Sequence, residues 1–80
     1  MPTLPPSAAL RAQLRQRIRD RTEELQIEDA AAAAERLGFT RAQMSRLNGD
    51  EDIFTLDRLI DAAARVGLTV RMTATRPYRS

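Results

Sequence analysis

The stretch from Ala30 to Gly49 constrains the fold of this chain more than any other. It runs Ala-Ala-Ala-Ala-Ala-Glu-Arg-Leu-Gly-Phe-Thr-Arg-Ala-Gln-Met-Ser-Arg-Leu-Asn-Gly, which predicts two short helices joined by a tight turn. Gly38 marks the turn, because a residue that ends one helix and redirects the chain commonly needs a left-handed backbone, which glycine adopts without a Cβ clash. Asn48-Gly49 is expected to end the second helix.

The start of the second helix carries its own signal. The Thr40 hydroxyl can accept a hydrogen bond from the amide of Gln43, whose side chain can reach back to the amide of Thr40, so the pair predicts a capping box. Small Ala33 and Ala34 allow the two helices to approach closely. The apolar residues that such a pair must bury are Leu37, Phe39, Met44 and Leu47. This arrangement is a helix-turn-helix.

Two stretches of the chain resemble the Cro/repressor-type (XRE) helix-turn-helix family. The first is residues 35–49, Glu-Arg-Leu-Gly-Phe-Thr-Arg-Ala-Gln-Met-Ser-Arg-Leu-Asn-Gly, and the second is residues 54–60, Phe-Thr-Leu-Asp-Arg-Leu-Ile. They are most similar to the small antitoxins of the HigA kind, whose pattern is a helix, this motif, a Phe-Ser/Thr-Leu-Asp helix and a short terminal strand. The resemblance covers about residues 10–72 and implies a mainly α, four- to five-helix, lambda-repressor-like domain. The chain departs from the family at Asp29-Ala30, where the family usually has a Thr-Gln pair whose Gln bonds a DNA phosphate.

In that family the start and outer face of the second motif helix contact DNA. The chemistry of this helix agrees, because Arg can donate two bonds to guanine, Gln can bond adenine, and Ser and Thr hydroxyls suit phosphate oxygens. Other roles stay open: Gln43 can be used by the capping box, Ser45 can bond its own helix backbone, and Arg46 can be a solvated surface residue. Arg41 is the main candidate for recognising a base. The residues expected to contact DNA are Thr40, Arg41, Ala42, Gln43, Ser45 and Arg46.

The resemblance also implies a second role. Antitoxins of this kind neutralise a ribonuclease toxin of the RelE/HigB type, and they commonly repress their own operon. The alternative is a stand-alone XRE-type repressor without a toxin partner. In both cases the expected ligand is double-stranded DNA with a palindromic operator, bound by a homodimer.

The composition argues against an enzyme. The 80-residue chain has no cysteine and no histidine, which removes disulfides, thiolate chemistry, the usual zinc ligand sets and the commonest general base. We expect no cofactor and no metal. The net charge of +2 gives no strong field over the whole molecule, so DNA binding must depend on where the charges lie. No apolar run has transmembrane length and the start has no signal-peptide pattern, so a cytoplasmic protein without a membrane contact is expected.

The two ends of the chain differ from the domain between them. Residues 1–6 are rich in proline and lack periodicity, so we expect a flexible arm ahead of a DNA-binding domain at 7–67. After Gly67 the pattern has period two, which predicts a strand over residues 68–76. Because a lone strand leaves its backbone unpaired, we expect it to pair with a second copy across a two-fold axis. The residues expected to form this dimer contact are Leu68, Val70 and Met72.

A first helix is expected from Ser7 to about Leu25 or Gln26. Beside its apolar stripe, Arg11, Arg15 and Arg19 form a row at four-residue steps. This row has two interpretations, a phosphate or partner contact or, as favoured here, a solvated face with local ion pairs from Arg19 to Glu23 and from Arg17 to Asp20. The stripe that should pack on the motif is Leu10, Leu14, Ile18 and Leu25.

Three acids, Asp50-Glu51-Asp52, follow the second motif helix in a loop. Facing a duplex they would repel it, so they count against tight DNA binding unless they point away. They can instead face solvent or a basic partner, and a metal site has the weakest support. The sequence leaves these alternatives open. Beyond the loop, Thr55 is expected to cap a helix over residues 56–66.

Overall fold

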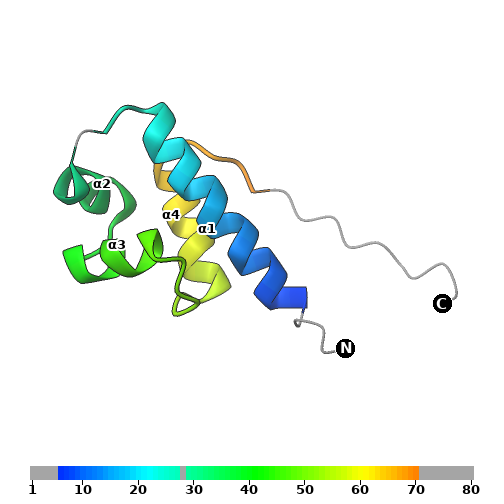
Figure 1. Ribbon diagram of the computed structural model, residues 1–80. Helices are drawn as coiled ribbons and strands as arrows, with labels where there is room; N and C mark the ends of the chain where they lie inside the picture. The colour runs from blue at the N-terminus through cyan, green and yellow to red at the C-terminus, as the bar shows by residue number, and fades with distance from the viewer. Residues whose placement is uncertain (1–5, 28, 71–80) are drawn as a thin grey trace, which may run out of the picture.

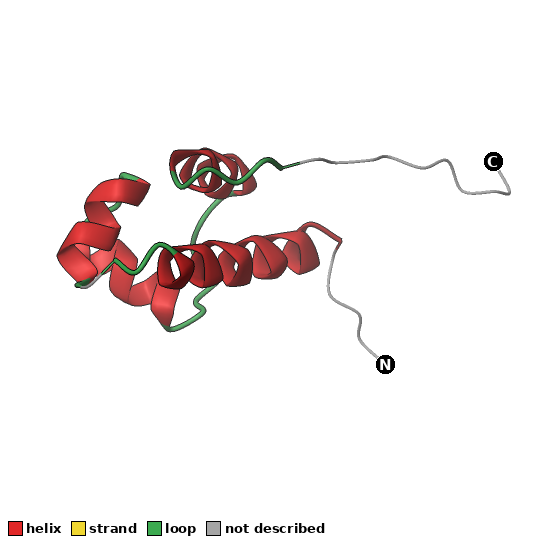
Figure 2. Cartoon of the chain, turned by 90° about the horizontal axis from the view of Figure 1, so that it is seen from above, coloured by secondary structure: helices red, strands yellow, loops and turns green. Residues whose placement is uncertain are grey.

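The computed structural model describes residues 6–27 and 29–70 (Figure 1). This part of the chain forms four helices: α1 (Pro6–Glu24), α2 (Ala30–Leu37), α3 (Arg41–Asn48) and α4 (Leu56–Arg65). The two longest helices, α1 and α4, pack on each other, and α2 and α3 lie together on one side of them (Figures 1 and 2). The predicted mainly helical helix-turn-helix domain is therefore confirmed. Of the predicted arm, Pro6 begins α1 and residues 1–5 lie outside the described residues.

The turn between α2 and α3 has the geometry that the sequence predicts. Asp29 caps α2 by accepting a hydrogen bond from the amide of Ala32 at 2.7 Å. Gly38 ends α2 in the left-handed region with φ of 75°. Thr40 and Gln43 form both bonds of the capping box, at 3.1 and 2.9 Å. Because these signals are local, they fix the ends of both motif helices independently of the rest of the fold.

One hydrophobic core joins all four helices. Its fully buried side chains include Ile18 of α1, which the predicted stripe anticipated. Leu14 and Leu25 of that stripe are partly buried against the core, whereas Leu10 remains 36% exposed. The other large side chains with less than 2% exposure are Leu37, Leu47, Leu59 and Val66. Alanines at the helix crossings complete the core and allow close approach: Ala33, Ala34, Ala62 and Ala63.

An aromatic pair links the turn of the motif to the loop before α4. The rings of Phe39 and Phe54 stack with centroids 4.8 Å apart and planes 12° apart. The guanidinium of Arg58 lies 5.1 Å from the Phe39 ring centroid and also donates to the Gly38 carbonyl oxygen. Burial and cation–π attraction thus hold α4 against the turn between α2 and α3.

Helix α4 has the predicted cap, since the Thr55 hydroxyl accepts from the amide of Arg58 at 3.1 Å. It ends at Arg65, one residue before the predicted end. The Arg21 guanidinium of α1 donates to the Val66 carbonyl oxygen at 2.9 Å, which places a cation at the negative end of α4.

The predicted strand over residues 68–76 is not supported by the part that the structure describes. Leu68, Thr69 and Val70 are not part of a strand there. Instead, the Leu68 amide donates to the Ala63 carbonyl oxygen at 2.9 Å, and the Leu68 and Val70 side chains pack against the core of their own chain. A strand whose only partner is a second copy has no ladder within one chain. Residues 71–76, including Met72, lie outside the described residues.

Replacing Gly38 by alanine should destabilise the fold by about 1 to 2 kcal/mol, because an L side chain at positive φ brings Cβ too close to the following carbonyl oxygen. The new Cβ would also lie 3.1 Å from the Arg65 guanidinium carbon. Gly49→Ala is the matched control, since Gly49 has φ of −80° and its nearest Cβ contact would be 3.6 Å. Chemical denaturation measures both variants, and equal losses would contradict this account of the turn.

Candidate nucleic-acid interface

Helix α3 buries one side and presents the other to solvent. Met44 and Leu47 lie in the core with exposures of 3% and 0%. The exposed residues of α3 include Arg41, Ala42, Ser45 and Arg46. Figure 1 shows α3 beside α2 at the edge of the domain.

The two predicted contact residues at the start of α3 are partly committed to the helix itself. The Gln43 side-chain oxygen accepts from the Thr40 amide, and the Thr40 hydroxyl oxygen accepts from the Gln43 amide. Pairing with adenine needs that side-chain oxygen as an acceptor, so it is unavailable while the capping box is intact. Gln43 is also only partly exposed. The geometry thus favours a structural role for this pair.

The two arginines of α3 are placed differently. Arg41 lies in the first turn and Arg46 in the last, and both are exposed. Across residues 6–27 and 29–70, neither guanidinium makes an ion pair or a hydrogen bond to a side chain. The Ser45 hydroxyl likewise forms no hydrogen bond within this range. These three groups are therefore available to an external ligand.

The beginning of α2 cannot serve as an anion site. The Asp29 carboxylate already lies at the positive end of that helix, where it accepts from the Ala32 amide. A phosphate there would meet a negative charge instead of free amide groups. The structure thus gives Asp29 a capping role at the start of α2.

The acidic loop faces a basic partner within the same chain. Arg11 binds both carboxylate oxygens of Asp52, at 2.7 and 2.9 Å. Arg15 donates to Asp50 at 2.9 Å and to Asp52 at 3.0 Å, and Arg19 donates to Asp50 at 3.1 Å. We call these five residues the arginine–aspartate cluster. It joins α1 to the loop between α3 and α4.

The sequence missed this cluster and predicted local pairs instead. Among the described residues, Arg19 does not pair with Glu23, and Asp20 accepts a hydrogen bond from Gln16 instead of pairing with Arg17. The prediction was wrong because helical spacing reports only neighbours on one helix, whereas the aspartate partners of Arg11, Arg15 and Arg19 lie more than 30 positions away. The four-residue spacing of the row and the run of acids were the available signals.

The cluster also determines the electrostatics next to α3. Hydrogen bonds from Arg15 and Arg19 lower the pKa of Asp50, and the bond from Arg11 lowers the pKa of Asp52. The same bond to Asp52 raises the pKa of Arg11. Both carboxylates therefore remain ionised and are balanced by guanidinium groups. The loop repels a duplex less than its sequence suggests.

Arg19 additionally secures the end of α3. Its guanidinium donates to the Leu47 carbonyl oxygen at 3.0 Å while it binds Asp50. Asp50 itself adopts a left-handed backbone with φ of 56°, and its amide donates to the Leu47 carbonyl oxygen. The last turn of α3 is consequently fixed to α1, which limits how the exposed side of α3 can tilt.

A capped two-helix motif whose second helix exposes unpaired arginines is the construction of a helix-turn-helix DNA-binding domain. The chain belongs to the helix-turn-helix domain family, because the model of that family matches residues 5–75. This family and the α3 surface together define a DNA-binding regulator. No curated protein and no solved structure matched the chain. No helix in the described ranges is both long and apolar enough to cross a membrane.

Acid should destabilise the protein through the cluster. Because the pKa values of Asp50 and Asp52 are held below the ordinary 3.8, their stabilisation is fully present above that pH. This stabilisation is lost as the pH falls through the lowered pKa values, because Asp50 and Asp52 then become protonated in the folded protein as well as in the unfolded chain. Thermal unfolding between about pH 6 and pH 2 should therefore show a falling midpoint below about pH 4.

Matched variants identify the source of that fall. Replacing Asp50 and Asp52 with Asn should lower the midpoint at neutral pH and reduce its further loss in acid. Glu51→Gln is the control, since Glu51 forms no ion pair with the described residues. If the Asn variant kept the full acid dependence of the unsubstituted protein, the cluster would not be its cause.

Proposed function

We propose that this protein is a homodimeric transcriptional repressor that binds a palindromic operator with α3 in the major groove. The observation that supports it most strongly is the exposed side of α3, on which Arg41 and Arg46 have no partner within residues 6–27 and 29–70. The pairing of Asp50 and Asp52 with arginines of α1 weakens the main argument against DNA binding. The proposal involves no catalytic step, cofactor or metal.

Each exposed residue has a role that fits its chemistry. Arg41 lies in the first turn of α3, where a guanidinium can reach a guanine edge with two donors. Ala42 can contact a thymine methyl group, and Ser45 can donate to a phosphate oxygen. Arg46 is assigned to a phosphate. Thr40 and Gln43 act by holding the start of α3, so they position this surface while leaving the base contacts to Arg41 and Ala42.

We further propose that residues 68–76 pair with the same segment of a second copy. The alternation of the sequence after Gly67 supports this, as does the unpaired backbone that a single strand would leave. Two copies related by a two-fold axis would present two α3 helices to the same side of a duplex. The half-sites of the operator would then lie about one helical turn, roughly 34 to 36 Å, apart.

The more specific proposal is that the repressor is the antitoxin of a RelE/HigB-type toxin. It rests on the resemblance of residues 35–60 to the HigA-type antitoxins. The alternative is a stand-alone XRE-type repressor. A reading frame for a small basic protein beside this gene, together with co-purification of its product, would support the antitoxin. Lack of such a neighbour would favour the stand-alone repressor.

Arg41→Ala should weaken binding to the cognate operator by roughly 1 to 3 kcal/mol and binding to scrambled DNA much less, because a base-edge contact is lost. Arg46→Ala should weaken both duplexes alike and lower the salt slope by about one, as expected for a phosphate contact. Arg17→Ala is the matched control for charge, since this exposed arginine lies at the groove between α1 and α4. Fluorescence anisotropy across salt concentrations measures all three. If Arg41→Ala weakened binding to both duplexes equally, Arg41 would contact a phosphate instead of a base.

Truncation after Val70 should convert the dimer into a monomer while leaving the described packing of Leu68 and Val70 in place. Sedimentation of the truncated chain at micromolar concentration tests this. Circular dichroism should show an unchanged helix content, which separates lost association from lost folding. A truncated chain that remains dimeric would place the dimer contact elsewhere, for example on α4.

A further inference from the structure

The chain leaves α3 through an aspartate in a backbone conformation that usually belongs to glycine. Asp50 has φ of 56°, in the left-handed region that glycine most often occupies after a helix. A glycine stands one position earlier, but Gly49 has φ of −80°, which any residue adopts. The sequence therefore places an aspartate at the position of this turn where glycine would fit with less strain.

The backbone around Asp50 caps the end of α3. The Asp50 amide donates to the Leu47 carbonyl oxygen at 3.0 Å. The Glu51 amide donates to the Arg46 carbonyl oxygen, also at 3.0 Å. These two bonds form the Schellman motif, which often ends a helix. The loop thus holds the backbone of Arg46, the residue of α3 that is assigned to a phosphate.

The end of α1 has the same backbone geometry with a different side chain. Gln26 also has φ of 56°. Its amide donates to the Glu23 carbonyl oxygen at 3.0 Å, and the Ile27 amide donates to the Thr22 carbonyl oxygen at 3.4 Å. Within residues 6–27 and 29–70, the Gln26 side chain forms no hydrogen bond. Ending a helix in this way therefore requires no ion-paired side chain.

The Asp50 carboxylate makes the contacts that the end of α1 lacks. Its Oδ1 atom accepts from Arg15 at 2.9 Å and from Arg19 at 3.1 Å. The same Nη1 atom of Arg19 donates to the Leu47 carbonyl oxygen, which the Asp50 amide also reaches. Arg19 is held in turn by the Gln16 side-chain oxygen at 2.6 Å. The end of α3 is therefore joined to α1 through both its backbone and a side chain.

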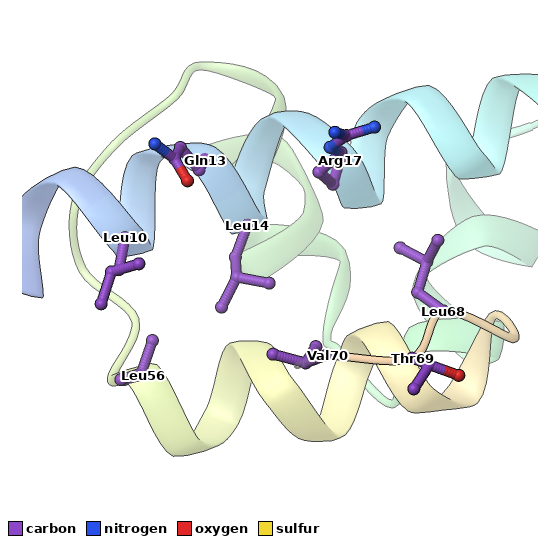
Figure 3. Close-up of a pocket in the computed structure, with 8 residues that line it drawn as sticks. All are labelled: Leu10, Gln13, Leu14, Arg17, Leu56, Leu68, Thr69 and Val70. Carbon is purple, nitrogen blue, oxygen red and sulfur yellow. The ribbon is translucent and has the colours of Figure 1, made fainter. Parts of the chain in front are cut away.

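Helix α1 is itself packed without these arginines. Ile18 is fully buried in the core, and in Figure 3 Leu10 and Leu14 point from α1 toward α4. The apolar groove that remains between α1 and α4 is lined by Leu10, Leu14, Leu56, Leu68 and Val70. Because apolar contacts hold α1 against α4, Arg15 and Arg19 attach α3 to a part of the domain that is already fixed.

We propose that Asp50 is a positioning residue for DNA binding, whose carboxylate sets the angle of α3 relative to α1 through Arg15 and Arg19. This inference rests on the proposed binding of DNA by α3. The left-handed backbone alone would end the helix, as it does at Gln26. The carboxylate adds an attachment to α1 that glycine cannot provide, which accounts for an aspartate at this position.

Asp50→Gly separates the two roles of this residue. Glycine suits the left-handed backbone, so the cap should remain while both ion pairs are lost. The variant should bind the palindromic operator about ten-fold more weakly, because Arg41 no longer meets its base edge in the correct orientation. Loss of a negative charge next to α3 would by itself strengthen DNA binding, so weaker binding reports the position of α3. Fluorescence anisotropy with the operator duplex measures this affinity.

Two matched variants control for the backbone and for the charge. Gln26→Gly makes the same substitution at the same φ without removing an ion pair, so operator affinity should not change. Glu51→Gln removes the neighbouring negative charge, which forms no ion pair with the described residues, and should not weaken binding. If Asp50→Gly bound the operator as tightly as the unsubstituted protein, Asp50 would only end the helix and the proposal would be wrong.

A measurement without DNA keeps this test separate from the proposed function. Residual dipolar couplings of the full chain, labelled with nitrogen-15, report the orientation of residues 41–48 relative to α1. Asp50→Gly should change these couplings, whereas Gln26→Gly and Glu51→Gln should preserve them. Unchanged couplings in Asp50→Gly would overturn the proposal. If the unsubstituted protein bound no operator, the DNA-binding proposal would fail and the couplings would still decide the role of Asp50.

Asp50→Asn guards against a glycine variant that does not fold. Asparagine tolerates the left-handed backbone and lacks the charge, so it weakens the attachment to Arg15 and Arg19 while keeping the cap. It should shift operator affinity and the couplings in the same direction as Asp50→Gly, by a smaller amount. An Asp50→Asn variant identical to the unsubstituted protein in both measurements would contradict the proposed role of the carboxylate.

Discussion

The placement of α3 depends on the arginine–aspartate cluster between α1 and the loop that follows α3. Arg15 is only 5% exposed, and a charged side chain this buried destabilises a fold unless a partner balances it. Asp50 and Asp52 supply that balance from a loop 35 and 37 positions away. Arg19 extends the same contact to the Leu47 carbonyl oxygen in the last turn of α3. The cluster consequently couples the packing of α1 to the orientation of the helix proposed to meet DNA.

The hydrophobic core provides the second constraint on α3. Met44 and Leu47 anchor its inner side, and the small residues Ala33 and Ala34 let α2 approach it closely. In a chain of 80 residues the core is limited in size, so each contact between elements matters more than in a larger domain. Polar contacts at the helix ends, such as the bond from Arg21 to Val66, add to this packing. The hydrophobic core, the capping box and the arginine–aspartate cluster together hold α3 in place. Its outer side is therefore suited to be a rigid DNA-recognition surface.

Local signals in the sequence were sufficient to predict the helix-turn-helix motif. They were insufficient to predict the contacts between elements that are distant in the sequence. Gly38, Thr40 and Gln43 act within a few residues of themselves, so their pattern predicts their geometry. The bond between Arg11 and Asp52 spans 41 positions and has no local signature. Charge counting alone could not tell whether the acidic loop faces DNA, solvent or a basic partner, because the answer depends on how α1 packs beside it. The period of the residues after Gly67 predicted a strand, yet Leu68 and Val70 pack on the core of their own chain.

The central claim is that α3 meets DNA through its exposed side. An NMR titration of the full chain, labelled with nitrogen-15, with a duplex from upstream of its own gene tests it directly. The account predicts that the amide shifts of residues 41–46 change most and that those lining the groove between α1 and α4 change little. Changes concentrated on α1 or α4, with α3 unaffected, would contradict the claim.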